Sequence, residues 1–219
     1  MTQFQMPLHV FVCVVDGQHI FLDLLRDRYF ALPPAENATF AALAEGCCVD
    51  LAASRLEPLI RAGVVSDQAA GKPVALTSHP PPDLSLAELA DADVPARLSD
   101  IVEITMLVLA ARRTVRRKAL PKAFSKLSNR PAEVPGRTLP LDGLVRRFVM
   151  ARRLVPVAPN CLYDSLALRR FLGRRGGHAD LVIGVKLHPF GAHCWLQDGT
   201  TVLNDSLGGA HIFTPVLVA

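Results

Sequence analysis

The chain has 219 residues, of which 50% are hydrophobic, and it carries a formal net charge of +4. This apolar content excludes a disordered chain and is sufficient for one sizeable domain or two small ones. The longest strongly apolar run, residues 101–111, contains Glu103 and is too short to cross a bilayer, so no membrane span is expected.

The N-terminal part of the chain favours a small β-meander followed by helices. Residues 1–15 lack a basic segment and a signal-peptidase motif, so we expect a cytoplasmic protein. Apolar runs at residues 8–15, 19–25 and 29–32, separated by Asp16-Gly17 and Arg26-Asp27, predict three antiparallel strands. Two prolines end the meander, and helical patterns follow at residues 35–46 and 51–62, the second with Asp50 as N-cap and Gly63 as its stop.

Proline-rich stretches divide the middle of the chain. Residues 66–83 and 121–140 are both broken by prolines and are expected to be linkers or boundaries. Helical patterns occupy residues 95–117 and 142–153. The first of these ends in a basic cluster, residues 112–118, which is most simply a solvated helix end. Contact with an acidic leader peptide or partner protein is the alternative.

A third helical pattern, residues 162–172, follows Cys161. Asn160 is a good N-cap and Pro159 restricts the chain before it, which places Cys161 in the first turn of the helix. Free backbone N–H groups and the positive end of the helix dipole lower the pKa of a thiol there. Gly173 is expected to stop the helix.

Three apolar runs after that helix predict strands at residues 179–185, 192–196 and 201–204, with an Asp-Gly hairpin between the last two. Because side chains alternate along a strand, His193 and Trp195 should share one face and Cys194 the other. His193 can therefore face the helix of Cys161. Asp205, at the end of the hairpin strand, should lie close enough to hydrogen-bond the His193 ring.

Taken singly, these residues have ordinary explanations, because a free cysteine is usually a small buried hydrophobe. Only the combination of Cys161, His193 and Asp205 indicates thiol chemistry. An odd cysteine count without a C-x-x-C pair argues against a disulfide framework and against a zinc site. The residues expected to be inert or unrelated to the site are Cys13, Cys47, Cys48, Cys194, His178, His188 and His211.

The order Cys, His, Asp on helix, strand and strand is that of the transglutaminase-like, papain-related cysteine enzymes. The last third of the chain resembles, more specifically, the B proteins of lasso-peptide biosynthesis. The residues that carry the resemblance are Cys161-Leu162, Ser165-Leu166-Ala167-Leu168, Leu181-Val182-Ile183-Gly184-Val185, Phe190, Ala192-His193-Cys194-Trp195 and Leu203-Asn204-Asp205.

The resemblance implies a leader peptidase that cuts a ribosomally made precursor. Cys161 would be the nucleophile, His193 would accept the thiol proton and return it to the leaving amine, and Asp205 would orient the ring. It also implies a precursor leader peptide and an asparagine-synthetase-like cyclase as partners. An ATP dependence is suggested by the resemblance alone, since the sequence has no phosphate-binding glycine loop and no cofactor is evident.

The N-terminal meander with its helices resembles the PqqD-like domains that recognise leader peptides. The residues that carry this likeness are Phe21-Leu22-Asp23-Leu24, Asp27-Arg28-Tyr29-Phe30-Ala31-Leu32 and residues 56–64. In that family the leader adds as a strand to the third strand of the meander. Carried over, Tyr29, Phe30, Ala31 and Leu32 would form the docking edge, with Leu56, Leu59 and Ile60 lining the groove.

We therefore predict an α+β protein. A winged-helix-like, PqqD-like domain would occupy residues 1–80, a linker residues 81–95, and a papain/transglutaminase-like protease domain residues 96–219. Two other functions stay open. One is an acyl transferase of the same fold. The other is a non-enzymatic peptide- or DNA-binding module, although the recognition helix at residues 51–62 offers only Arg55 and Arg61 for phosphate contacts, so we expect no nucleic-acid partner.

Overall fold

The computed structural model describes residues 4–46, 53–66, 71–89, 95–117, 120–121, 124 and 140–219. Within these residues the chain forms two compact units, Met1–Ser78 with Thr214–Leu217, and His79–Phe213 with Val218–Ala219. Of the residues in the sequence predictions, Cys47, Cys48, Asp50 and the last residue of the basic cluster 112–118 lie outside the described residues. Much of the proline-rich stretch 121–140 and part of the linker 81–95 lie outside them as well.

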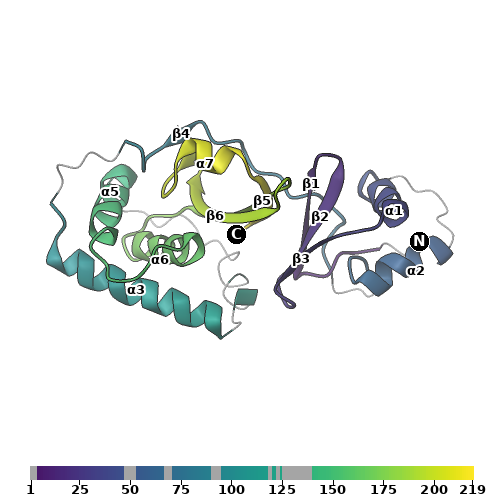
Figure 1. Ribbon diagram of the computed structural model, residues 1–219, viewed down its shortest axis with the longest axis horizontal. Helices are drawn as coiled ribbons and strands as arrows, with labels where there is room; N and C mark the ends of the chain where they lie inside the picture. The colour runs from purple at the N-terminus through teal and green to yellow at the C-terminus, as the bar shows by residue number, and fades with distance from the viewer. Residues whose placement is uncertain are drawn as a thin grey trace. The chain divides into compact units, whose positions relative to one another are not determined.

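The first unit contains an antiparallel sheet of three strands in the order β1 (Val10–Val15), β2 (Gln18–Asp23) and β3 (Arg28–Ala31). The β1–β2 hairpin turns at Asp16 and Gly17, whose φ angles of 50° and 76° suit a two-residue turn of the type that matches strand twist. Helices α1 (Pro34–Ala44) and α2 (Ala53–Ala62) follow. The predicted meander and both helices are thus present in the structure (Figure 1).

The core of the first unit explains why these elements form. The buried apolar side chains that share one cluster are Met6, Val10, Val12, Phe21, Leu32, Phe40, Leu59, Val64 and Val65. They come from the strands, from both helices and from the segments that flank them, so the sheet and the helices bury their apolar sides against each other.

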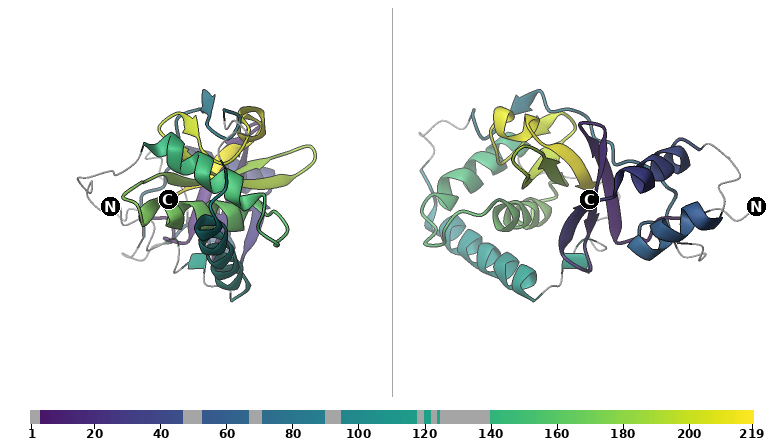
Figure 2. Two further views of the ribbon diagram at one scale, coloured as in Figure 1. Left: turned by 90° about the vertical axis from the view of Figure 1, so that its left-hand side faces the viewer. Right: turned by 45° about the vertical axis from the view of Figure 1, so that its right-hand side comes forward.

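The second unit is built around α6 (Cys161–Gly173), which lies between α3 (Leu98–Arg116) and the strand β6 (Gly191–Asp198), as Figures 1 and 2 show. Helix α5 (Leu141–Arg152) packs against both α3 and α6. The strands of this unit have the order β4 (Leu84–Ser85), β7 (Thr201–Val202), β6 and β5 (Asp180–Lys186). The last strand of the chain is β8 (Thr214–Val218), of which Thr214–Leu217 is counted with the first unit. Helix α7 (Leu207–His211) follows β7 in the chain.

Ion pairs hold α3 to its two neighbouring helices. The guanidinium of Arg147 on α5 donates from Nη2 to Asp100 Oδ1 at 2.7 Å and from Nε to Oδ2 at 3.0 Å. Glu103 accepts from Arg174 and Arg175 at the end of α6, at 3.0 and 2.6 Å. Asp100 is buried, and a buried carboxylate needs such a bidentate partner.

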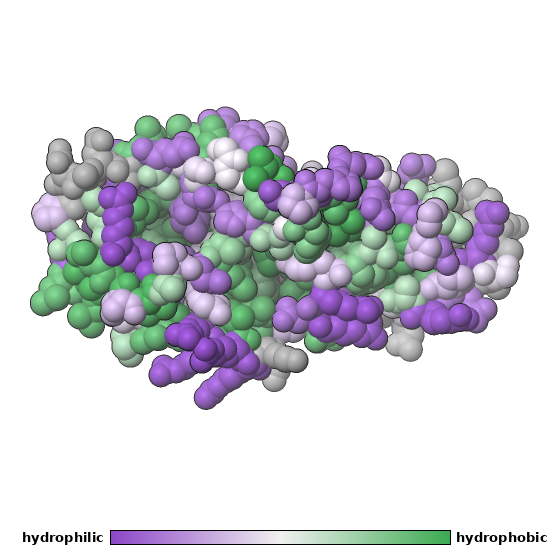
Figure 3. Space-filling view, viewed as in Figure 1, coloured by the Kyte–Doolittle hydropathy of each residue, from purple (hydrophilic) through white to green (hydrophobic). Residues whose placement is uncertain are grey.

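The outward face of α3 has an apolar half and a basic half. Large apolar side chains are exposed on its N-terminal half, whereas arginines occupy its C-terminal end. In Figure 3 the corresponding surface is hydrophobic at the lower left and strongly hydrophilic below the middle of the view.

The α+β class is confirmed, with a small N-terminal sheet and a C-terminal region of helices and a second sheet. Among the elements given above, the sequence analysis missed β4, α7 and β8. Helix α7 has only five residues, two of them glycines, and such a short segment has no helical periodicity to detect. The predicted strand at residues 201–204 was too long, because β7 ends at Val202. Within the described residues, no helix is long and apolar enough to cross a membrane.

Candidate active site

Cys161 is the first residue of α6, as predicted. The side chain of Asn160 caps the helix by accepting a hydrogen bond from the Tyr163 N–H at 3.1 Å, and Asp164 Oδ2 accepts one from the Asn160 N–H at 3.2 Å. Arg152 of α5 donates from Nε to Asp164 Oδ1 at 2.7 Å. The helix start is therefore fixed both by its own cap and by an ion pair to α5.

The thiol of Cys161 is set up to be ionised. A hydrogen bond with the His193 side chain is the main cause that holds the pKa of Cys161 below its usual value. Partial burial opposes this shift, while the charge of His193 and the backbone N–H groups of Cys194 and Leu162 support it. Cys161 is half-buried, unlike Cys13 and Cys194, which are buried.

His193 lies on β6 and connects the thiol to a carboxylate. Its Nε2 atom is hydrogen-bonded to Asp205 Oδ2. When the ring is protonated, this contact is also an ion pair. This bond is the main cause that raises the pKa of His193 to about 9, and the hydrogen bond with Cys161 adds to it. The two shifts favour a thiolate and an imidazolium at neutral pH.

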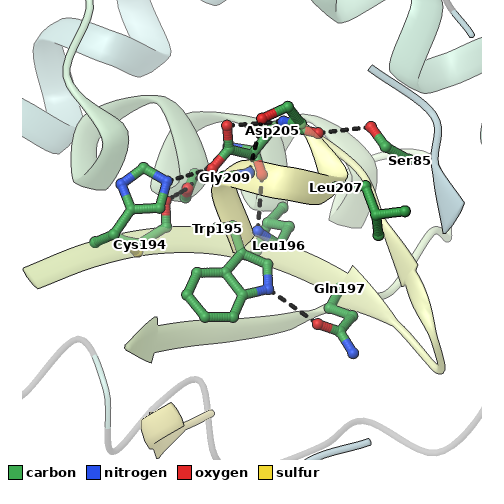
Figure 4. Close-up of polar contacts among 12 residues, drawn as sticks. Ser85, Cys194, Trp195, Leu196, Gln197, Asp205, Leu207 and Gly209 are labelled. Carbon is green, nitrogen blue, oxygen red and sulfur yellow. Dashed lines mark hydrogen bonds and ion pairs between the residues drawn. The ribbon is translucent and has the colours of Figure 1, made fainter. Parts of the chain in front are cut away.

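Aromatic rings hold the His193 side chain in place. Trp195, on the same face of β6, stacks near it with ring centroids 6.1 Å apart, and Phe213 lies 5.2 Å away. The Trp195 indole N–H donates to Gln197 Oε1 at 2.9 Å (Figure 4). Gly184 pairs with His193 across β5 and β6, and a Cβ atom there would lie 2.7 Å from Phe213 and 2.8 Å from Trp195. A side chain at position 184 would thus displace the rings that flank His193.

Asp205 lies in the turn between β7 and α7 rather than at the end of a strand. Its Oδ1 accepts a hydrogen bond from the Ser206 N–H at 2.8 Å, and its backbone carbonyl accepts one from the Ser85 hydroxyl at 2.6 Å (Figure 4). Gly209 of α7 approaches so closely that a Cβ atom there would lie 3.0 and 3.1 Å from the two carboxylate oxygens. The carboxylate is therefore oriented by its own turn and by the backbone of α7.

A buried hydrogen-bond chain joins the three elements that carry these residues. The Ser165 hydroxyl, one turn after Cys161, donates to the Cys194 carbonyl at 3.1 Å and accepts from Asn204 Nδ2 at 2.9 Å. Asn204 Oδ1 accepts from the Leu196 N–H at 2.7 Å. Ser165 is completely buried. These hydrogen bonds thus fix the backbone directly beside His193 and directly before Asp205.

The sequence analysis missed Ser165 and Asn204 as parts of the site. The signal for Ser165 was available, because a polar residue on the apolar face of a helix must find a buried partner. Gly184 and Gly209 gave no such signal, since a glycine in a sequence does not reveal which side chain approaches it.

The remaining cysteines in the described part of the chain have different environments. Burial raises the pKa of Cys194 strongly and that of Cys13 to about 12, which keeps both thiols protonated. His193, rather than His178, His188 or His211, is the histidine that interacts with Cys161. No group of three His, Cys, Asp or Glu side chains suited to a metal ion occurs among the described residues.

A cavity of about 280 Å³ lies beside the start of α6. It is bordered by Asp164 and Asn204 and by apolar side chains of α5 and of the segment that follows it, including Phe148, Val155 and Val157. Asp164 is in the first turn of the cysteine helix and Asn204 precedes Asp205, so the cavity adjoins the elements that position the site.

The residues predicted to bind a leader peptide differ in accessibility. Tyr29 and Phe30 of β3 are half-buried, Ala31 is exposed, and Ile60 of α2 is exposed. Leu32, Leu56 and Leu59 are buried, with Leu32 and Leu59 inside the core cluster of the first unit. Among the described strands of this sheet, β3 pairs only with β2 and forms one edge.

The structure thus brings Cys161, His193 and Asp205 together, as the sequence analysis expected. The family model of the transglutaminase-like superfamily matches residues 103–218, more than half of the chain, and the chain belongs to this superfamily. The microcin J25-processing protein McjB of Escherichia coli is 47% identical over 47 residues, which are 22% of this chain and 23% of that protein. The matched segment therefore spans about a quarter of the relative's length.

Both findings support the resemblance to lasso-peptide B proteins, whereas a PqqD-like domain is not shown by either. No solved structure matches the chain.

Proposed function

We propose that the chain is a leader peptidase of lasso-peptide biosynthesis, a cysteine protease that removes the leader from a ribosomally made precursor. The observation that carries the proposal is the connection of Cys161 to His193 and of His193 to Asp205 within a transglutaminase-like fold. The similarity to a protein named for processing microcin J25 supports a peptide precursor as the substrate.

In the proposed reaction the Cys161 thiolate attacks the carbonyl carbon of the scissile peptide bond, and the carbonyl electron pair moves onto oxygen. The Cys161 N–H is one donor for this oxyanion. As the C–N bond breaks, His193 gives its proton to the leaving amine and a thioester remains on Cys161. Water then attacks the thioester, His193 takes up its proton, and the thiolate is released.

Asp205 has a supporting role in this scheme. It binds Nε2 of His193, which leaves Nδ1 to exchange the proton with Cys161 and the substrate. The same contact favours the imidazolium that must persist until the leaving amine is protonated. The cavity beside the first turn of α6 is a suitable place for a substrate side chain near the scissile bond.

We further propose that the first unit binds the leader by strand addition along β3. Among the described strands of this sheet β3 pairs only with β2, so an extended peptide could add along its other side. Phe30 stacks on Phe21 with ring centroids 5.3 Å apart, and Arg28 lies over Phe30, so the edge has a firm side-chain support. Because Leu32, Leu56 and Leu59 are buried, Tyr29, Phe30, Ala31 and the exposed Ile60 carry the contact in this proposal.

The test of the function is to search the reading frames beside this gene for a short precursor and to follow its cleavage by mass spectrometry. The full chain should release one leader fragment of defined mass, and Cys161→Ala should release none while still binding the precursor. Cys13→Ala, in the other unit, is a matched control that should cut normally. Equal cutting by wild type and Cys161→Ala would contradict the proposal.

An acyl transferase of the same fold is the second candidate, because the thioester could pass to an amine instead of water. The family match favours neither acceptor. Adding small primary amines to the same assay separates the two, since only a transferase yields an amide of increased mass. An asparagine-synthetase-like cyclase as partner stays a proposal of the lasso-peptide assignment.

A further inference from the structure

We propose that the outward face of α3 is a docking surface for an acidic amphipathic helix of a partner protein. We call this face the α3 outer face and define it by Leu98, Val102, Met106, Arg113 and Arg116. At 100° per residue all five fall within an arc of about 80° around the helix axis. The face thus forms one continuous stripe along the helix.

The N-terminal half of the stripe is apolar and exposed. Leu98, Val102 and Met106 are 76%, 57% and 59% exposed, although the opposite side of α3 already buries Ile104, Leu107, Val108 and Ala111 in the protein. A surface helix normally places polar residues opposite its buried side. A row of large exposed apolar side chains at one-turn spacing is instead typical of a surface that binds another chain.

The C-terminal half of the stripe is basic. Arg113, Arg116 and the adjacent Arg117 are exposed, and no ion pair joins them to a carboxylate within the described residues. The acids of α3 cannot neutralise them, because Asp100 pairs with Arg147 and Glu103 with Arg174 and Arg175. These exposed guanidinium groups are therefore available to pair with the carboxylates of a docked partner.

Three occupants are compared: a second copy of this chain, a membrane surface and an acidic helix of a partner protein. The arrangement of charge on the α3 outer face favours the acidic helix. In a second copy of this chain, parallel α3 helices would set arginines against arginines, and antiparallel helices would set them against apolar side chains. Helices that lie on membranes carry their cations along the flanks of the apolar face, whereas these arginines continue the apolar face along the axis. A helix with apolar residues at three- or four-residue spacing followed by carboxylates matches both halves.

The experiment is a selection of displayed helix-forming peptides, randomised at their surface positions, against the full chain. Binders retained by the Val102→Ser/Met106→Ser variant are discarded. The surviving sequences should have an apolar stripe that ends in Asp or Glu. The best peptide, labelled and measured by fluorescence anisotropy, should bind more weakly as ionic strength rises.

Variants then separate the two halves of the face. Val102→Ser/Met106→Ser and Arg113→Glu/Arg116→Glu should each weaken the selected peptide by about tenfold or more. A peptide whose acids are replaced by Lys should regain affinity for the Arg113→Glu/Arg116→Glu variant. Arg55→Glu/Arg61→Glu, the same charge change on α2, is the control that should leave affinity unchanged. All substituted side chains are exposed, so circular dichroism should report intact folds.

Several results would overturn the proposal. One is that no peptide depends on the α3 outer face, or that the dependent peptides are not acidic. Another is that the α2 control weakens binding as much as the α3 variants do. A dimer in sedimentation velocity that disappears in Val102→Ser/Met106→Ser would replace it with self-association. Binding to phosphatidylcholine–phosphatidylglycerol vesicles that is lost in the same variants, without any peptide binding, would replace it with a membrane contact.

Discussion

The first turn of α6 and the middle of β6 both contain a cysteine, and the two regions shift the pKa of its thiol in opposite directions. At the helix start, Cys161 is half-buried beside His193, and its thiol pKa is lowered. On the strand, Cys194 is buried, and its pKa is raised. The two residues lie in neighbouring elements joined through Ser165. The comparison teaches that access and a hydrogen-bonding cation, rather than residue type, make a thiol reactive.

Replacing Cys161 and Cys194 in turn by Ala should give the largest difference in the rate of leader removal. We expect Cys161→Ala to lower the rate of leader removal by about 10⁴-fold or more, because the nucleophile is lost. Cys194→Ala should keep most of the activity and lose some stability through the buried cavity that it creates. Cleavage kinetics and thermal unfolding of both variants measure these effects. An inactive but folded Cys194→Ala would make the second thiol part of the mechanism.

The partners of Cys161 should act as one unit. His193→Ala and Asp205→Ala are each expected to lower the rate by roughly 10²–10⁴-fold, and the double variant should be little worse than His193→Ala alone. The reason is that Asp205 works through the ring it holds. Single and double variants in one kinetic series check this. Penalties that multiply would show that Asp205 acts independently of His193.

The pH dependence should distinguish the two thiols directly. The active form needs a Cys161 thiolate, present above its lowered pKa, and a His193 imidazolium, present below its raised pKa of about 9. Leader removal should therefore rise with pH as Cys161 ionises, at a lower pH than an ordinary thiol, and fall as His193 loses its proton near pH 9. Iodoacetamide at neutral pH, followed by peptide mapping, should label Cys161 well before Cys194. A profile that keeps rising beyond pH 9 would mean that a neutral His193 suffices.

The hydrogen-bond chain between the two regions should have a smaller effect. We expect Ser165→Ala to lower the cleavage rate by about ten- to hundredfold with little change in precursor affinity, since the strand of His193 loses its tie to α6. Ser165→Thr, which keeps the hydroxyl, should restore part of the rate. The pH profile separates positioning from a general loss of stability, because a loss of stability lowers the fraction of active enzyme while its pH profile stays unchanged.

The smallest effect on chemistry should come from the first unit. In β3 the N–H groups of successive residues point in opposite directions, so one of Phe30→Pro and Ala31→Pro removes an outward donor and the other disturbs the pairing with β2. The variant that remains folded should bind labelled leader more weakly, by anisotropy, yet cut a leaderless substrate normally. Unchanged leader binding by both folded variants would exclude β3 as the docking edge.

Local signals in the sequence predicted the helix start at Cys161, the hairpin of β6 and β7, and the shared face of His193 and Trp195. Each depends on residues within a few positions, such as Asn160 or the Asp-Gly turn. The contacts that were missed join residues far apart in the chain, such as Arg147 with Asp100 and Ser165 with Asn204. Periodicity shows that a position is buried, but it does not identify the partner on another element.

The unknown partner of an apolar face also explains why Leu56 and Leu59 were predicted to line a leader groove although they are buried in the structure. The apolar pattern of α2 correctly indicated a helix with one apolar face, and this face includes Leu56 and Leu59. Pattern alone could not tell whether that face would meet a ligand or the protein's own sheet. In the structure Leu59 packs in the core of the first unit, and Ile60, one position further, is exposed.

The half-buried thiol at the start of α6 also has a consequence for the sensitivity of the protein to oxidation. A thiolate that a substrate can reach is equally open to peroxide, which converts it first to a sulfenic acid that reductants reverse and then to sulfinic acid that they do not. The other thiols within the described residues, Cys13 and Cys194, are buried and too far toward the protonated form to compete for oxidant. Inactivation during storage should therefore follow the oxidation of this one sulfur, and prompt addition of dithiothreitol should recover only its early stage.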